Sequence, residues 1–97
     1  MRAARIDENQ TEIVKALKDI GCTVQTLASV GHGVPDLLVG CGFNILMEVK
    51  DGSKPPSKRR LTPDQEKWHK EWKGQVVVVE TVKEAIAIAM AYRPRGF

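Results

Sequence analysis

The sequence lacks the features that mark several common classes of protein. Its two cysteines, Cys22 and Cys41, have neither a C-x-x-C spacing nor histidines at zinc-site intervals, which argues against a zinc ribbon or a disulfide-rich scaffold. No apolar run is long enough to cross a membrane, and no stretch resembles a signal peptide, a glycine-rich phosphate loop or a nucleophilic triad. We therefore expect a soluble, cytoplasmic protein without a nucleotide cofactor, with both cysteines acting as small buried apolar residues.

The chain does contain enough apolar residues for one domain. Its 97 residues are 42% hydrophobic and 28% charged, which predicts a single globular domain over 1–97. The net charge of +3 is compatible with nucleic acid without requiring it. Basic residues gather in one loop (Lys54, Lys58, Arg59, Arg60), at the start (Arg2, Arg5) and at the end (Arg93, Arg95).

The spacing of apolar residues predicts seven elements in the order α-β-β-β-α-β-α. We expect helices at about 7–20, 62–73 and 81–92, and strands at about 22–28, 36–40, 43–50 and 75–80. Asp7, Thr62 and Thr81 are the expected N-caps. The near-continuous apolar character of the second and third strands predicts central strands that are covered on both faces. This order predicts an α/β fold with a mixed central sheet flanked by helices.

The stretch 34–51 is the most informative part of the sequence. It contains Asp36, an apolar run, a glycine-rich turn, a second apolar run, and then Glu48 and Lys50. Because side chains alternate along a strand, Glu48 and Lys50 share one face. If the two strands pair as a hairpin around residues 40–44, Asp36 and Glu48 come close together in space.

Two neighbouring carboxylates repel each other, and one of them would normally hold a proton. A divalent cation removes this conflict, and oxygen ligands that leave room for water and phosphate suit Mg²⁺ or Mn²⁺. Lys50 could then orient or deprotonate an attacking water, or neutralise charge on a phosphate. The alternative is that Glu48 and Lys50 form a solvated ion pair on an exposed strand face. The pattern favours a metal-dependent phosphodiesterase centre.

The two helices that flank this stretch carry further candidates. Glu8 and Glu12 lie one turn apart and off the main apolar face, either as solvated carboxylates or with one of them directed toward the metal. Gln65 completes a capping box with Thr62 and could also reach the active site. His69 is expected to be structural or exposed.

Three other segments have weaker expectations. Trp68 and Trp72, one helical turn apart, are expected to face the sheet rather than to stack on bases. His32, in a flexible glycine-containing turn, is expected to be exposed. The loop at 52–60 contains two prolines and four basic residues, and could close over a DNA backbone through salt-sensitive phosphate contacts.

In this order the motifs resemble the PD-(D/E)xK nuclease superfamily, and within it the VRR-NUC domain of virus-type replication-repair nucleases. The resemblance includes a glutamate on the first helix and a Gly-x-Pro-Asp turn at 33–36. It continues with Glu-Val-Lys at 48–50, a Leu-x-x-x-Gln helix start at 61–65, and a glycine before a valine-rich strand at 74–79. It covers nearly the whole chain and implies a restriction-endonuclease-like αβββαβα core.

The resemblance also implies roles for the central residues. Asp36 and Glu48, together with the backbone carbonyl of Val49, would hold Mg²⁺ or Mn²⁺, and Lys50 would position or activate the attacking water. The helix glutamate maps best to Glu8, as a further metal ligand.

For that helix position Glu12 stays open as an alternative to Glu8. Gln65 matches the glutamine that lies near the active site in this family. Stand-alone members from phage and bacteria look like dimers similar to Holliday-junction resolvases, which implies a homodimer for this chain.

We therefore expect a metal-dependent DNA endonuclease, a homodimer that acts on branched DNA such as four-way junctions. A nuclease of linear or nicked duplex DNA keeps the chemistry and changes the substrate. A DNA-binding module without catalysis is a third alternative. No motif in the chain reads a base sequence, so sequence specificity is not expected.

Overall fold

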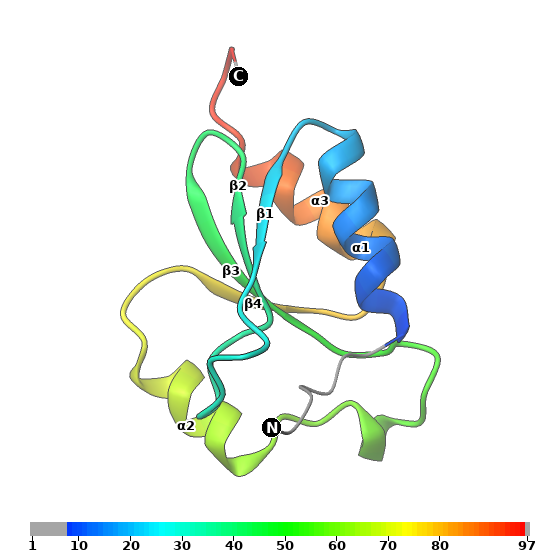
Figure 1. Cartoon of the computed structure of the whole chain (residues 1–97), viewed down its shortest axis with the longest axis vertical. Coiled ribbons are helices and arrows are strands. Elements are labelled where there is room, and N and C mark those ends of the chain that lie inside the picture. The colour runs from blue at the N-terminus through cyan, green and yellow to red at the C-terminus, as the bar shows by residue number, and fades with distance from the viewer. Residues whose placement is uncertain (1–7, 97) are drawn as a thin grey trace.

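The structure, a computed structural model, describes residues 8–96, so the predicted cap Asp7 and the basic residues Arg2 and Arg5 lie outside it. The elements follow the predicted order (Figure 1). They are α1 (Glu8–Asp19), β1 (Thr23–Thr26), β2 (Leu37–Gly40), β3 (Asn44–Val49), a short 3₁₀ helix η1 (Pro56–Lys58), α2 (Pro63–Glu71), β4 (Val76–Val79) and α3 (Val82–Tyr92). The short helix η1 lies within the predicted basic loop.

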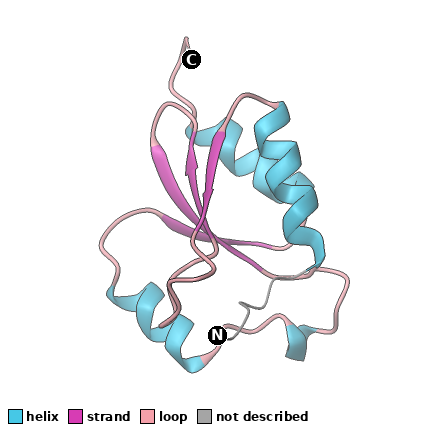
Figure 2. Cartoon of the chain, viewed as in Figure 1, coloured by secondary structure: helices cyan, strands magenta, loops and turns pink. Residues whose placement is uncertain are grey.

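The four strands form one mixed sheet in the order β1-β2-β3-β4, which confirms the predicted α/β class. The first three strands are antiparallel neighbours, and β4 joins β3 in parallel. The parallel pairing requires a crossover, and residues 50–75 supply it through η1 and α2. Figure 1 and Figure 2 show the α2 part of this segment beyond one end of the sheet, on the side away from the two long helices.

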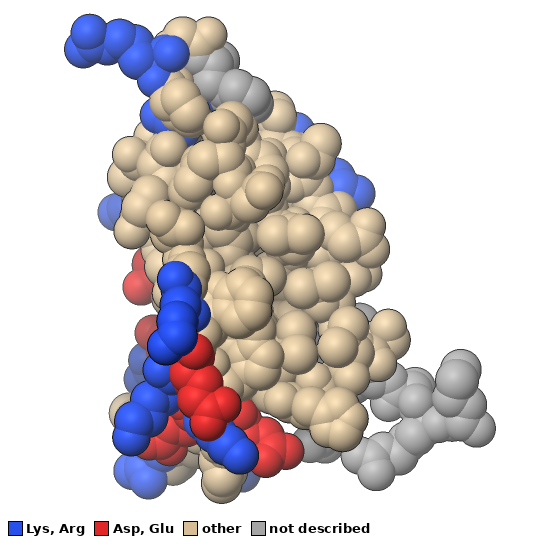
Figure 3. Space-filling view, turned by 90° about the vertical axis from the view of Figure 1, so that its left-hand side faces the viewer, with Lys and Arg blue, Asp and Glu red and all other residues tan. Residues whose placement is uncertain are grey.

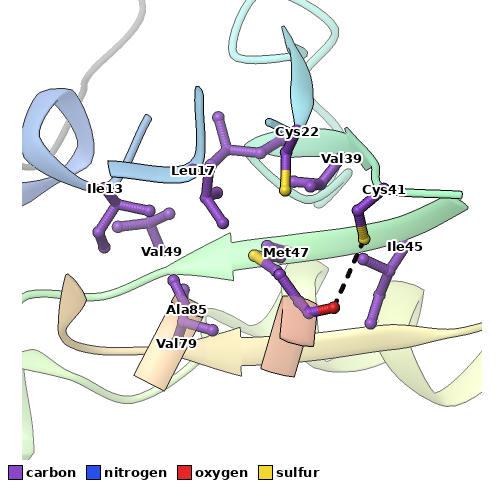
Figure 4. Packing of buried hydrophobic residues seen from close by; sticks show 12 residues of the cluster. Ile13, Leu17, Cys22, Val39, Cys41, Ile45, Met47, Val49, Val79 and Ala85 are labelled. Atoms are coloured by element: carbon purple, nitrogen blue, oxygen red, sulfur yellow. Dashed lines mark hydrogen bonds between the residues drawn. The ribbon is translucent and has the colours of Figure 1, made fainter. Parts of the chain in front are cut away.

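The core lies between the sheet and the pair α1 and α3, which pack side by side on one face (Figure 1). Ile13 and Leu17 of α1 meet Val39 and Met47 of the sheet, and Ala89 of α3 belongs to the same cluster (Figure 4). All five are fully buried. Alternation along the strands therefore directs the intervening residues to the opposite face.

That opposite face is covered only in part. The prediction of two strands buried on both sides is correct for β3, where every residue from Ile45 to Val49 is buried. It is wrong for β2, because Leu38 is 37% exposed. Trp72 follows α2 and lies beside Leu38 and Leu46, yet remains 47% exposed. The crossover segment thus covers the C-terminal end of β3, where Glu48 lies, and leaves Leu38 of β2 partly exposed.

The predicted capping box of α2 is confirmed. Thr62 Oγ1 accepts from the Gln65 amide at 3.2 Å, and Gln65 Oε1 accepts from the Thr62 amide at 2.9 Å. The helix ends at Glu71, two residues earlier than expected. Thr81 also caps its helix, since its Oγ1 accepts from the Glu84 amide. The Glu84 carboxylate accepts from the amide of Glu80, whereas a complete capping box would use the amide of Thr81. No helix within residues 8–96 is both long and apolar enough to cross a bilayer.

Candidate active site

The two carboxylates of the central motif lie on neighbouring strands, as the hairpin predicted. Leu37 of β2 pairs with Met47 of β3, so the register continues with Asp36 opposite Glu48. Because Leu37 and Met47 face the core, the side chains of Asp36 and Glu48 belong to the opposite face, which α2 covers. Asp36 Oδ2 accepts a hydrogen bond from the Val49 amide at 2.7 Å, which ties this carboxylate to the end of β3.

Gln65 links the glutamate to the lysine. Its Nε2 donates to Glu48 Oε2 at 3.2 Å, and its Oε1 accepts from Lys50 Nζ at 2.8 Å. The same Oε1 accepts from the Thr62 amide, so the capping box holds the side chain in place. Glu48 is only 1% exposed, and the alternative of a solvated ion pair with Lys50 is therefore wrong. One amide thus orients a buried carboxylate and an ammonium group together.

Gly33 allows α2 to approach this closely. Its φ of +82° is a conformation that favours glycine, and a Cβ built on it would lie 2.3 Å from the carbonyl oxygen of Asp64 and 2.9 Å from the Gln65 nitrogen. The glycine turn and the first turn of α2 are therefore in backbone contact. Pro35 is buried just before Asp36 and fixes the entry into β2. His32 is exposed, as expected, beside a hollow of about 310 Å³ that Trp68 also lines.

His69, which the sequence predicted to be structural or exposed, is part of the same cluster. It lies one turn after Gln65 on α2, and its Nε2 is 3.7 Å from Glu48 Oε1. Burial lowers the pKa of His69 below its usual value of 6.5, and the charge of Lys50 lowers it further. Both effects favour the neutral form of the ring. The four-residue spacing from Gln65 was the signal for this position, because residues i and i+4 share a helix face.

The depressed pKa of His69 gives a direct test of this arrangement. We expect its imidazole to titrate below pH 6.5 in an NMR experiment, and to move part of the way back in Lys50→Gln, because burial is the larger cause. The unfolded state then binds the proton more tightly than the folded state. The contribution of His69 to stability is therefore present above its unfolded pKa and is lost as the pH falls through the folded value. A titration midpoint above 6.5 would show that the ring is not buried beside Lys50.

The helix glutamates line a hollow of their own. Glu8 and Glu12 line a hollow of about 490 Å³ with Asp51 and Glu80, at the N-terminal end of α1. Asn9 between them donates to the carbonyl oxygens of Lys50 and Glu80, so the helix start is fixed against the chain that follows β3. Within residues 8–96, no three Asp, Glu, His or Cys side chains are grouped closely enough to hold a metal. The placement of Glu8 as a further ligand stays a prediction.

The donor atoms at the β2–β3 end nevertheless suit a hard cation. Asp36 and Glu48 supply carboxylate oxygens and Val49 a carbonyl, which is the ligand chemistry of Mg²⁺ and Mn²⁺. Mg²⁺ usually keeps several waters and takes only one or two carboxylates. Glu48 is a carboxylate buried to 1% exposure, and such a group is costly without positive charge nearby. The chemistry of the residues present therefore fits a hard divalent cation.

Charges of both signs are mixed on the surface of the chain. Figure 3, which shows the left-hand side of Figure 1, has blue and red side chains intermixed at the lower left and a broad uncharged area above them. In the basic loop, Arg59 pairs with Glu80 at 3.2 Å, whereas Lys54, Lys58 and Arg60 are exposed. These three exposed basic residues lie in the loop that follows Lys50.

Fold and site together define a class: an α/β protein with a D…ExK motif at the end of a central hairpin and a glutamine-bearing crossover helix. In a comparison with solved structures, the chain matches a "VRR_NUC domain" with a TM-score of 0.61 and 27% sequence identity, over 86% of this chain and 91% of that one. No protein-family model matches the sequence. No curated protein matches it either. The structural match confirms the resemblance to the VRR-NUC domain.

Proposed function

We propose that this protein is a metal-dependent DNA endonuclease that hydrolyses phosphodiester bonds. The observation that carries the proposal is the chain of hydrogen bonds from Lys50 through Gln65 to the buried Glu48, opposite Asp36. The likeness to a domain whose name marks it as a nuclease supports the same conclusion. A protein that only binds DNA has no use for two carboxylates facing phosphates, because they would repel the ligand.

In this proposal, Asp36, Glu48 and the Val49 carbonyl would hold Mg²⁺ or Mn²⁺. The bound cation would supply Lewis-acid stabilisation of the charge that builds up on the phosphate. Glu8 is the proposed further ligand, and Glu12 its alternative. Both belong to the N-terminal part of α1, which Asn9 fixes against the Lys50 backbone.

Lys50 acts on the attacking water. One N–H of its ammonium group donates to Gln65 Oε1. An ammonium group has three donors, so two are left for a water or a phosphate oxygen. Gln65 accepts a hydrogen bond from Lys50 and donates one to the Glu48 carboxylate, so its role is to position the two charged groups. Removal of an electrostatic contributor of this kind typically lowers the rate about a hundredfold or more.

For the substrate we propose branched DNA, such as a four-way junction, cut by a homodimer. A small single domain offers little surface, and a two-fold dimer presents two equivalent sites to a two-fold-symmetric junction. The exposed Lys54, Lys58 and Arg60 would contact the DNA backbone without reading sequence. Linear or nicked duplex DNA is the alternative substrate.

The test is cleavage of a labelled four-way junction beside a matching linear duplex, with Mg²⁺, Mn²⁺ or EDTA, by wild type and Lys50→Ala. We expect paired symmetric nicks on the junction alone, dependent on both the cation and Lys50. Equal cutting of the two substrates would leave a nuclease and remove the junction preference. Binding of both without any cutting would favour the non-catalytic DNA-binding module.

A further inference from the structure

The two cysteines adjoin neighbouring strands, Cys22 directly before β1 and Cys41 directly after β2. Thr23 of β1 pairs with Gly40 of β2, so the register continues with Cys22 opposite Cys41. In the same register Leu27 faces Asp36, and the Leu27 amide donates to the Asp36 carbonyl at 2.7 Å, so these two residues form a hydrogen-bonded pair. Hydrogen-bonded and non-hydrogen-bonded pairs alternate along an antiparallel ladder, and the cysteines are five positions away. They are therefore a non-hydrogen-bonded pair, whose Cα atoms are typically about 4.5 Å apart. That separation lies within the range of about 4.4–6.8 Å that disulfides span.

The remaining backbone contacts agree with this assignment. The Cys22 amide donates to the Leu17 carbonyl, and the Cys41 amide donates to the Phe43 carbonyl. Neither cysteine amide bonds to the other cysteine. Both side chains belong to the buried cluster beneath α1 and α3 and lie on the same side of the sheet (Figure 4).

The surroundings of the pair explain how it stays reduced and how it can react. Burial raises the pKa of the Cys41 thiol, and the neighbouring Cys22 raises it further. Both cysteines are free thiols, with Cys22 5% exposed and Cys41 fully buried. An Arg93 guanidinium nitrogen lies 4.0 Å from the Cys22 sulfur, so a positive charge faces the more accessible thiol. Exchange is therefore slow and begins at Cys22.

We propose that Cys22 and Cys41 form a latent cross-strand disulfide, a redox modification site that joins β1 to β2 under oxidising conditions. The oxidant is a small-molecule disulfide. The Cys22 thiolate attacks one of its sulfurs and releases one small thiol, which leaves a mixed disulfide on Cys22. The Cys41 thiolate then attacks the Cys22 sulfur and releases the second small thiol. The protein loses two protons and two electrons, and the small disulfide is reduced to two thiols.

The consequence of this bond is stability. It closes a loop from Cys22 to Cys41 and fastens the edge strand β1, which follows α1, to the inner strand β2. Cys41 follows β2, whereas Asp36 precedes it, so the bond lies at the opposite end of this strand from the candidate active site. It therefore leaves the carboxylates in place and raises the cost of unfolding.

The experiment treats the full chain with oxidised glutathione, once in buffer and once in urea just below the unfolding transition, where local opening exposes buried thiols. We expect an intact mass lower by two hydrogen atoms, no thiol left for alkylation after denaturation, and a linked peptide joining the two cysteine segments. The Tm of the oxidised chain should rise by about 10 °C and return with dithiothreitol.

Cys22→Ala and Cys41→Ala serve as matched controls, since each keeps one buried thiol and cannot close the loop. Neither should gain stability under oxidation. A stable glutathione adduct on wild type, a disulfide between two chains, or two alkylatable thiols after both treatments would each overturn the proposal. None of these readouts depends on nuclease activity.

Discussion

Glu48→Gln is expected to abolish saturable Mn²⁺ binding and to lower the rate of DNA cleavage about a hundredfold or more. The amide keeps the volume of the carboxylate. Its oxygen can still accept from Gln65 Nε2, which in the wild type donates to Glu48 Oε2 at 3.2 Å. What the substitution removes is the negative charge at a position that is 1% exposed. The fold should therefore survive while the proposed site loses its central anionic ligand.

The measurements are Mn²⁺ titration by electron paramagnetic resonance, single-turnover cleavage and DNA binding in EDTA. Glu66→Gln is the matched control, because it removes the same charge from an exposed position on α2. We expect the control to cleave like wild type, and both variants to bind DNA. Asp36→Ala and Lys50→Ala should also bind without cutting. Wild-type cleavage by purified Glu48→Gln would eliminate the assigned site.

Gly33→Ala is expected to destabilise the protein far more than Gly31→Ala. The two glycines have similar positive φ angles, +82° and +74°. A Cβ at Gly31 has nothing within 4 Å, whereas a Cβ at Gly33 would lie 2.3 Å from the Asp64 carbonyl oxygen. The Gly31 variant is thus destabilised only by the cost of placing alanine in a left-handed backbone conformation, about 1–2 kcal/mol. The Gly33 variant must also push the start of α2 away, which adds about 1–3 kcal/mol.

Urea unfolding of both variants measures the difference in the free energy of unfolding. Displacement of α2 also separates Gln65 from Glu48 and Lys50, so the Gly33 variant should lose cleavage under conditions where it is still folded. The Gly31 variant should retain cleavage. Equal losses of stability would mean that the turn and α2 are not in the contact described, and that glycine at 33 serves only the turn.

Local features of the sequence predicted the elements well, because caps and periodicity depend on near neighbours. The Thr62 capping box and the burial of β3 on both faces hold in the structure. The prediction that β2 is buried on both faces was wrong, because an apolar run in the sequence is the same whether or not a helix covers its second face. The crossover segment reaches only part of the sheet, and this left Leu38 exposed.

The candidate site divides in the same way. Asp36, Glu48 and Lys50 could be placed together from the sequence, because a short hairpin and strand alternation relate them locally. His69 was missed, and Gln65 was only a candidate, because their distance to Glu48 depends on how α2 docks after a crossover of many residues. Glu8 lies with Glu12, Asp51 and Glu80 at the start of α1, and its role at the metal remains a prediction.

The sequence by itself determined the seven elements, the α/β class, the pairing of Asp36 with Glu48, and the shared face of Glu48 and Lys50. Each of these follows from spacing within a few residues, where backbone geometry leaves little choice. Only the tertiary structure decided which helix covers that face, how deeply Glu48 is buried, and that Gln65 joins it to Lys50. It also placed Cys22 opposite Cys41. These relations join segments far apart in the chain, and they depend on the packing of α2 against Gly33 and on the strand register.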